Sequence, residues 1–229
     1  MLITPGPIFG AASGRLGGIV ASHNKYGMYF RNGSIPVKAT SPAALNAKAR
    51  MATISQQYQS LTSAQKLAWL AWCTTNPGTN RLGQQITLSP NAAYVSLNTR
   101  LHFLGVASIV DPPLTPAPVA LLTLVQSCDI GIGTFDLTFT ATPLGAADVL
   151  WIQSCVVDSS GINWVQNLLR LIGATAGAQA SPFDHEALVT ARFGTLQVGQ
   201  TVHSQVAAVD STNGQISPAL ATKTLVTST

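Results

Sequence analysis

The side chains with the clearest potential for chemistry match no known catalytic motif in their spacing. His185 stands beside Glu186, as in the helical zinc motif of metalloproteases. That motif needs a second histidine four residues after the first, where this chain has Val189, so no zinc site is predicted. Gly131-Ile132-Gly133 is followed by neither a Lys-Ser/Thr pair nor a predicted helix, so it predicts a turn rather than a phosphate-binding loop.

The remaining histidines and cysteines are scattered. The histidines are His23, His102, His185 and His203. Residues 1–110 contain no Asp or Glu that could complete a triad, a carboxylate pair or a metal site with them. We therefore expect that the protein is not an enzyme and takes no metal or other cofactor. The cysteines are odd in number and lack metal-ligand spacing, which predicts reduced structural thiols: Cys73, Cys128 and Cys155.

Charge is distributed unevenly along the chain. Nine of the twelve Lys and Arg residues lie in residues 1–110, whereas all eight acids lie from Asp111 onward with the other three cations. The formal charges of the two parts are therefore +9 and −5. This asymmetry predicts that the N-terminal part lies against something negatively charged.

Charged residues are also scarce overall, at 9% of the chain against roughly 25% in typical globular proteins. One interpretation is a subunit whose surface is largely covered by neighbours in an assembly. The other is a stable domain with a surface coated by Ser and Thr. Apolar runs such as residues 119–122 are far shorter than the roughly 20 residues of a membrane span. We expect neither a membrane protein nor, from the Met1 start, an exported one.

A proline-rich segment predicts the domain boundary. Residues 111–118 contain four prolines, which favour a stiff, extended linker, and the charge changes sign at the same place. The predicted organisation is a basic docking module at 1–110, a linker at 111–118 and a second domain at 119–229.

The basic module is predicted to be α+β, a β-hairpin followed by about three helices. Residues 15–22 and 27–31 alternate loosely between apolar and polar around a turn-rich connection, which predicts the hairpin. Three helix starts follow, at Ser41-Pro42, at the capping-box spacing of Thr62 and Gln65, and at Ser89-Pro90.

Apolar residues at helical spacing predict one face on each helix. The three faces are Leu45, Ala49, Ala52 and Gln56; Leu67, Leu70, Ala71 and Thr74; and Tyr94, Leu97, Leu101 and Leu104. Trp69 and Trp72 lie three residues apart, hence close together on the second helix. They could anchor a partner or pack in the core of the module.

The C-terminal part is predicted to be all β. Six segments rich in β-formers are separated by turn residues: 135–139, 149–157, 164–172, 187–193, 201–209 and 219–226. Short strands at this spacing predict an antiparallel sandwich. With the run Leu196-Gln197-Val198-Gly199-Gln200-Thr201 leading into its sixth strand, the domain resembles the fibronectin type III or immunoglobulin-like class. It departs from that class in having Val202 where a tyrosine is usual and no tryptophan near Ala141.

The N-terminal part carries a second resemblance. Residues 14–31 read GRLGGIVASHNKYGMYFR and are followed by Pro36, Ser41-Pro42-Ala43-Ala44, Arg50, Leu61-Thr62, Gln65, Trp69 and Tyr94-Val95-Ser96-Leu97-Asn98. In order and spacing, these residues resemble a family of uncharacterised phage and prophage proteins, which often join such a basic module to a fibronectin-like one. The resemblance implies a virion structural protein, with Arg15, Lys25 and Arg31 at the family's basic positions.

These observations predict partner docking by cations and aromatic side chains of the basic module. The candidate docking residues are Arg15, Lys25, Tyr26, Tyr29, Arg31, Lys38, Trp69 and Trp72. We expect the module to dock on an acidic surface of a capsid, neck or tail, while the sandwich projects outward. The chain would be present in several copies in the virion, assembled in the host cytoplasm, with a particle-surface decoration favoured over a tail protein.

Two alternatives remain open. The cations could instead bind phosphates of packaged or host nucleic acid, with aromatic side chains stacking on bases. The sandwich could add adhesion to the host surface. No membrane partner and no small-molecule substrate are expected.

Overall fold

The computed structural model describes residues 2–3, 13–24, 27–33, 41–79, 85–140 and 144–228. The chain forms two compact units, Met1–Lys48 and Ala49–Thr229. Both antiparallel sheets and helices are present, so the fold is mixed α+β. None of the helices in the described ranges is long and apolar enough to cross a membrane.

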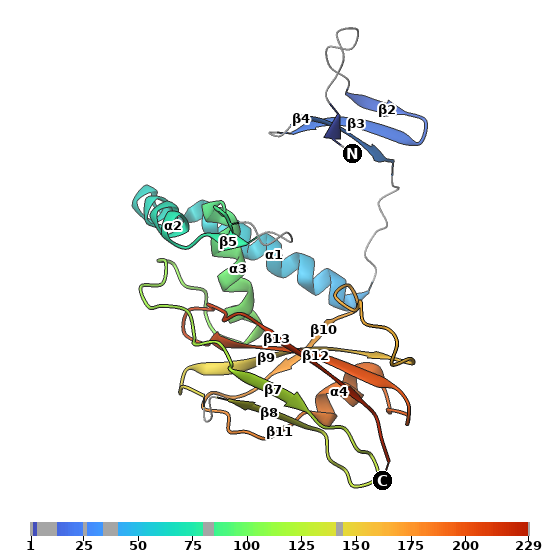
Figure 1. The fold of residues 1–229 in the computed structure, drawn as a ribbon. Coiled ribbons are helices and arrows are strands. Elements are labelled where there is room, and N and C mark those ends of the chain that lie inside the picture. Colours follow the sequence, from blue (N-terminus) through green and yellow to red (C-terminus); the bar gives the residue numbers. More distant parts are fainter. Residues whose placement is uncertain are drawn as a thin grey trace. The chain divides into compact units, whose positions relative to one another are not determined.

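The first unit contains a four-stranded antiparallel sheet in the order β1-β4-β3-β2 (Figure 1). Its strands are β1 (Leu2–Ile3), β2 (Gly14–Leu16), β3 (Ile19–Asn24) and β4 (Gly27–Asn32). The predicted hairpin is present as β3 and β4, but its first strand was predicted too long. Gly17 has a φ of 57°, which permits a tight turn and places residues 14–16 in a separate strand.

Three helices follow at the predicted starts: α1 (Pro42–Ser60), α2 (Ser63–Thr75) and α3 (Pro90–Phe103). The capping box of α2 is formed, because the Gln65 amide donates to Thr62 Oγ1 at 3.3 Å and Gln65 Oε1 accepts from the Thr62 amide at 2.9 Å. Ser89 caps α3 by accepting from the Ala92 amide at 3.3 Å. A short ladder of β5 (Gly78–Thr79) and β6 (Gln85–Ile86) lies between α2 and α3.

The helices share one apolar core. Ile54, Trp69, Cys73, Tyr94 and Leu97 are buried together within it. The Trp69 ring meets the Tyr94 ring edge-on at 5.4 Å, and the indole N–H donates to the Val110 carbonyl at 2.9 Å. Trp69 therefore serves the core, with its polar edge satisfied.

Burial differs from the predicted apolar face on two of the three helices. On α3, Tyr94, Leu97 and Leu101 are buried, as the spacing predicts. On α2, by contrast, Leu67 and Leu70 are 65% and 48% exposed, because the helix turns Trp69 and Cys73 inward. The predicted stripe of α1 is likewise exposed while Ile54 is buried. The larger aromatic ring on α2 fills the core, and the leucines are left outside.

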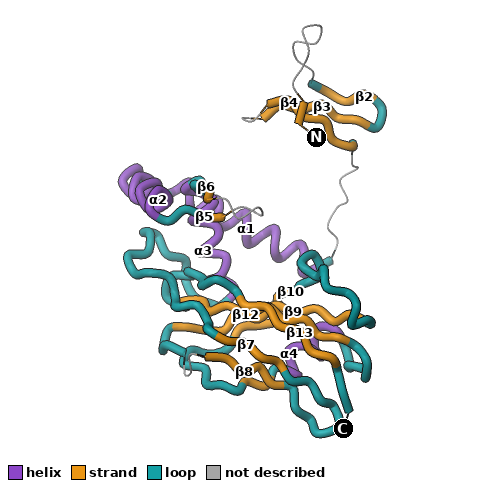
Figure 2. Tube along the Cα trace, in the orientation of Figure 1, coloured by secondary structure: helices purple, strands orange, loops and turns teal. Residues whose placement is uncertain are grey.

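The rest of the second unit is a body of two antiparallel sheets, drawn as two layers of strands in Figure 2. One sheet has the order β10-β9-β12-β13 and the other β11-β8-β7. The strands are β7 (Thr123–Gln126), β8 (Asp136–Thr140), β9 (Asp148–Val157), β10 (Arg170–Ala174), β11 (Phe183–Asp184), β12 (Thr201–Asp210) and β13 (Leu220–Leu225). Leu137 and Phe139 of β8 pack on Leu150, Ile152 and Val206 of the facing sheet.

Two of the predicted strands are wrong. Residues 187–193 form helix α4 (Glu186–Phe193), which buries only Val189 and ends at Gly194 with a φ of 85°. Its alanines and leucine are good helix formers, and buried Val189 with partly buried Leu188 and Phe193 attaches the short helix to the core. Of residues 164–172, only the end from Arg170 joins a strand, and the preceding residues form a loop with turns.

The proline-rich segment and the residues just before it are held by the helices and by the sheets. On the helix side, Asn98 Oδ1 accepts from the Ile109 amide at 2.7 Å. On the side of the sheets, Asn213 Nδ2 donates to Thr115 Oγ1 at 2.9 Å. The end of α3 also contacts the body, since the Phe103 and Trp151 rings meet edge-on at 4.9 Å. Within residues 49–229 the helices and sheets form one compact unit, and separate folding of 1–110 and 119–229 stays a prediction.

The difference in burial between Trp69 and Trp164 predicts that they contribute unequally to stability. Trp69→Ala should lower the free energy of unfolding by about 3–5 kcal/mol, because it empties a core site and removes the bond to Val110. Trp164→Ala should change it by less than about 0.5 kcal/mol, since that side chain is 78% exposed. Urea unfolding followed by circular dichroism measures both, and equal losses would contradict the assigned core.

Candidate functional site

The sheet of the first unit brings three of the candidate docking residues onto one face. Arg15 on β2 pairs with Val20 on β3, and Val20 pairs with Arg31 on β4, so both arginines lie in one row across three strands. Tyr29 stands two residues before Arg31 and therefore points to the same side. We call Arg15, Val20, Tyr29 and Arg31 the arginine face.

The charged side chains of the arginine face are all positive. Both arginine side chains are exposed, and Arg15 Nε donates to the Gly17 carbonyl at 3.0 Å, which orients its guanidinium. The whole region 1–110 has no carboxylate of its own to neutralise either group. A paired row of guanidinium groups suits planar, bidentate recognition of carboxylate or phosphate.

The other candidate docking residues do not join this face. Lys25, Tyr26 and Lys38 lie outside the described residues. Trp69 and Trp72 belong to the second unit, where Trp69 is fully buried and Trp72 is half-buried beside it, their ring centroids 5.9 Å apart. Core packing is the interpretation that fits Trp69, and it removes that side chain from the docking set.

Several apolar side chains of α1 and α2 are exposed, which the aromatic pattern did not indicate. Leu67 and Leu70 stand on the outer side of α2, and Leu45 and Met51 on α1 are about half exposed. Leaving such side chains in water is costly, at roughly 25 cal/mol for each Å² of apolar area. Their helical spacing was visible in the sequence, but only burial shows that it faces outward.

The candidates for catalytic chemistry are structural. His185 is buried, its Nδ1–H donates to the Phe135 carbonyl at 2.9 Å, and its Nε2 then accepts from the Gln126 amide at 3.2 Å. Burial lowers the pKa of His185 to about 4, although the bond to Phe135 and the charge of Asp184 oppose that shift. The imidazole is therefore neutral near pH 7 and holds two sheet elements together.

The cysteines are equally poor candidates for reactivity. All three are buried free thiols. Burial raises the pKa of Cys128 to about 12, with further contributions from Glu186 and Asp129. Burial likewise raises the pKa of Cys73 and Cys155. Thiols that stay protonated are weak nucleophiles, and no group of residues in the described ranges could hold a metal ion.

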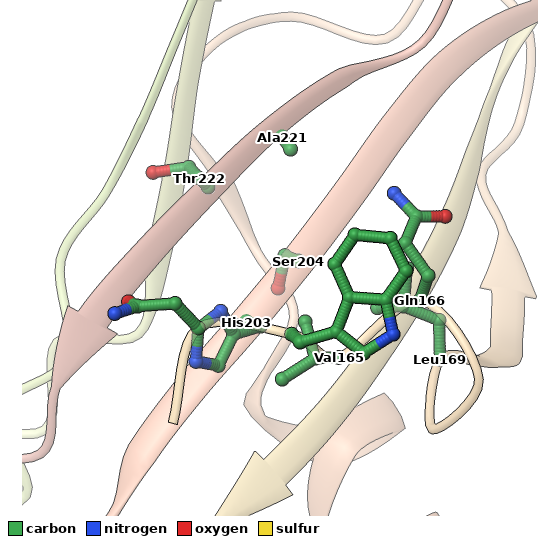
Figure 3. A pocket seen from close by; sticks show the side chains of 9 residues that line it. Val165, Gln166, Leu169, His203, Ser204, Ala221 and Thr222 are labelled. Carbon is green, nitrogen blue, oxygen red and sulfur yellow. The ribbon is translucent and has the colours of Figure 1, made fainter. Parts of the chain in front are cut away.

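A hollow on the sheet of β9, β12 and β13 is the second feature that sequence patterns missed (Figure 3). Its volume is about 230 Å³. Figure 3 shows Ser204, Ala221 and Thr222 on two neighbouring strands and Val165 and Gln166 on the loop beside them. The lining is completed by Asn163, Trp164, Leu169 and His203. The sequence prediction had placed a strand at this loop, so its side chains were not expected to frame a site.

Another hollow, of about 280 Å³, lies between the helices and the loop after β12. Trp72, Leu88 and Leu97 line it together with Arg100, whose Nη1 donates to the Gly214 carbonyl at 2.9 Å. Burial lowers the pKa of Arg100. This arginine joins α3 to the body, which is a structural role.

His185 predicts a pH dependence of stability. The unfolded imidazole has its ordinary pKa of 6.5, so between pH 6.5 and about 4 the unfolded chain binds a proton that the folded chain excludes. The contribution of His185 to the free energy of unfolding should be at its full value above pH 6.5 and fall by about 1.4 kcal/mol per pH unit between pH 6.5 and about 4. Urea unfolding at several pH values measures this slope.

Two variants separate titration from packing. His185→Gln should lower stability at pH 7 and flatten the slope below pH 6.5. Val189→Ala empties space in the neighbouring buried cluster without removing a titrating group, so it should lower stability at every pH and keep the slope. An unchanged slope in His185→Gln would refute the assignment.

Comparison of the chain with models of protein families, with curated proteins and with solved structures gives no match. Its function therefore has to be inferred from its own residues and geometry.

Proposed function

We propose that this chain is a structural protein of a phage particle and attaches to an acidic surface of another virion protein through its N-terminal unit. The observation that carries the proposal is the arginine face, where Arg15 and Arg31 lie in one row of the sheet. Residues 1–110 hold no carboxylate to pair with these groups, and an acidic partner surface would supply it. Charge complementarity of this kind sets the orientation and the rate of association.

The exposed helix faces support a second, apolar contact in the same assembly. Leu67 and Leu70 would lose their contact with water when a neighbouring virion protein, or another copy of this chain, covers α2. The low charge content of the chain fits a subunit with several covered surfaces. We therefore favour a repeated decoration of a capsid, neck or tail over a component present once.

We assign the two-sheet body to the fibronectin type III or immunoglobulin-like class of sandwich. Three strands face four, and the central pair, β9 and β12, joins segments that are distant in the sequence. In the proposed particle this body would project from the attachment surface. A compact sandwich with exposed loops suits that position, because its loops can vary without loss of the core.

Nucleic-acid binding is the alternative that the arginine face also permits, and ionic strength distinguishes the two. Phosphate contacts release counterions, so the logarithm of the affinity for DNA falls steeply and linearly with the logarithm of the salt concentration. Tyr29 beside Arg31 could stack on a base. Against this alternative, the described part of the arginine face has two guanidinium groups, which is sparse for a phosphate-tracking surface.

Attachment can be tested with the full chain and DNA-free phage particles. Arg15→Glu combined with Arg31→Glu should weaken binding to empty heads or tails at least about tenfold, which is 1.4 kcal/mol or more. Arg192→Glu, an exposed charge reversal on α4, should leave binding unchanged. Co-sedimentation measures binding, and cryo-electron microscopy of particles locates the chain. Salt-sensitive binding to DNA with no binding to empty particles would exclude docking.

The apolar contact gives a separate prediction. Leu67→Ser combined with Leu70→Ser should reduce incorporation into particles, while the free energy of unfolding changes by less than about 1 kcal/mol. Leu114→Ser is the matched control, because Leu114 is 99% exposed and lies off the helices. Equal incorporation of all three proteins, measured by quantitative mass spectrometry of purified particles, would show that α2 makes no contact in the assembly.

A further inference from the structure

The loop between β9 and β10 displays a tryptophan that neither the fold nor the proposed docking uses. Trp164 is 78% exposed, although indole is among the side chains that gain most from burial. The next residue, Val165, is buried against Cys155 and Val157 on β9. Val165 thus fixes the loop to the sheet, with partly buried Leu169 beside it, while Trp164 is presented to solvent.

Hydrogen bonds hold this loop in a defined shape. The Leu168 and Leu169 amides donate to the Val165 carbonyl at 2.8 and 3.1 Å. Lys223 Nζ on β13 donates to Asn163 Oδ1 at 2.7 Å, which joins the loop to the edge strand. A displayed aromatic ring on a fixed loop loses little conformational entropy when it binds a ligand.

The hollow beside Trp164 has a neutral, polar lining. The side chain that can exchange hydrogen bonds with a ligand is the amide of Gln166, because Thr222 pairs with Ser204 and its hydroxyl therefore lies on the opposite face of the sheet. His203 also lines it, and its Nε2 has no hydrogen-bond partner in the described part of the chain. Burial lowers the pKa of His203, and Lys223 lowers it further, so this ring is neutral too. Neither a carboxylate nor a cation belongs to the lining, and Lys223 on the adjoining strand is bonded to Asn163.

Size and charge restrict the class of ligand. A volume of about 230 Å³ lies below the roughly 300–1,000 Å³ of sites for drug-sized ligands and cofactors, so the hollow suits a single small ring. Residues 111–229 carry a formal charge of −5, which disfavours nucleic acid and other polyanions. A neutral molecule with one apolar face and several hydroxyl groups satisfies both restrictions.

We propose that the hollow beside Trp164 binds a neutral sugar ring of a glycan. The C–H face of a pyranose would stack on the indole, and its hydroxyl groups would exchange hydrogen bonds with Gln166, with His203 Nε2 as an acceptor at the bottom. Such a site would give the projecting body a ligand on a glycan-coated surface. It rests on residues of the two-sheet body alone and stands whether or not the arginine face docks on a virion.

Binding can be tested with the isolated full chain, so that a failure of docking does not affect the result. The probes are methyl glycosides of glucose, galactose, mannose, rhamnose and N-acetylglucosamine, together with an array of immobilised neutral glycans. At least one should shift the Trp164 indole resonance in a ¹H–¹⁵N spectrum, with a Kd on the order of 1–10 mM for a single ring. Trp164→Phe assigns that resonance.

Variants decide whether the hollow is the site. Trp164→Ala should abolish binding, Trp164→Tyr should retain part of it because a phenol ring also stacks, and Gln166→Ala should weaken it about tenfold. Leu168→Ala is the control, because this neighbouring exposed side chain does not line the hollow. The proposal would be overturned if no glycoside shifts the resonance at concentrations well above that Kd and the array retains no protein. Perturbation of Trp164 only by oligothymidine or by a proline-rich peptide would overturn it as well.

Discussion

The pairing of β9 with β12 is the interaction on which the rest of the second unit depends. The two ten-residue strands are antiparallel and in continuous register from Asp148 opposite Asp210 to Val157 opposite Thr201. Both strands are largely buried, because the facing sheet covers one side and other elements cover parts of the other. Ser154 and Ser204 lie opposite each other in this ladder and share a hydrogen bond of 2.9 Å, so even the polar pair at its centre is satisfied.

The outer face of that central pair explains where the accessory elements lie. At one point it receives Phe103 from the end of α3 against Trp151. At another it receives Val165 against Cys155 and Val157, which anchors the loop carrying Trp164. The proposed glycan site is therefore a consequence of incomplete cover on a sheet face. The arginine face depends on a different sheet, so attachment and ligand binding would be carried by separate surfaces.

Several features of the candidate sites were predictable and others were not. Arg15, Tyr29 and Arg31 stood out because a region with cations and no acid is predicted to lie against something negatively charged. That the two arginines share a row required the strand register, which the turn at Gly17 sets. Trp164 was missed because β-formers around it predict a strand, whereas the residues form a loop in which Val165 turns inward and Trp164 outward. The sequence left two roles open for Trp69, partner docking and core packing, and only its packing against Tyr94 distinguishes them.

The sequence by itself determined the features that depend on neighbouring residues. Thr62 and Gln65 encode the start of α2, Ser89 and Pro90 that of α3, and the position of every acid after residue 110 fixes the charge asymmetry. Tertiary structure alone decided which side of α1 and α2 is buried, that residues 186–193 form a helix, and how the segment around Thr115 is held. The reason is physical: a cap or a turn is closed by bonds within a few residues, whereas burial is decided by the shape of distant segments that compete for the same core.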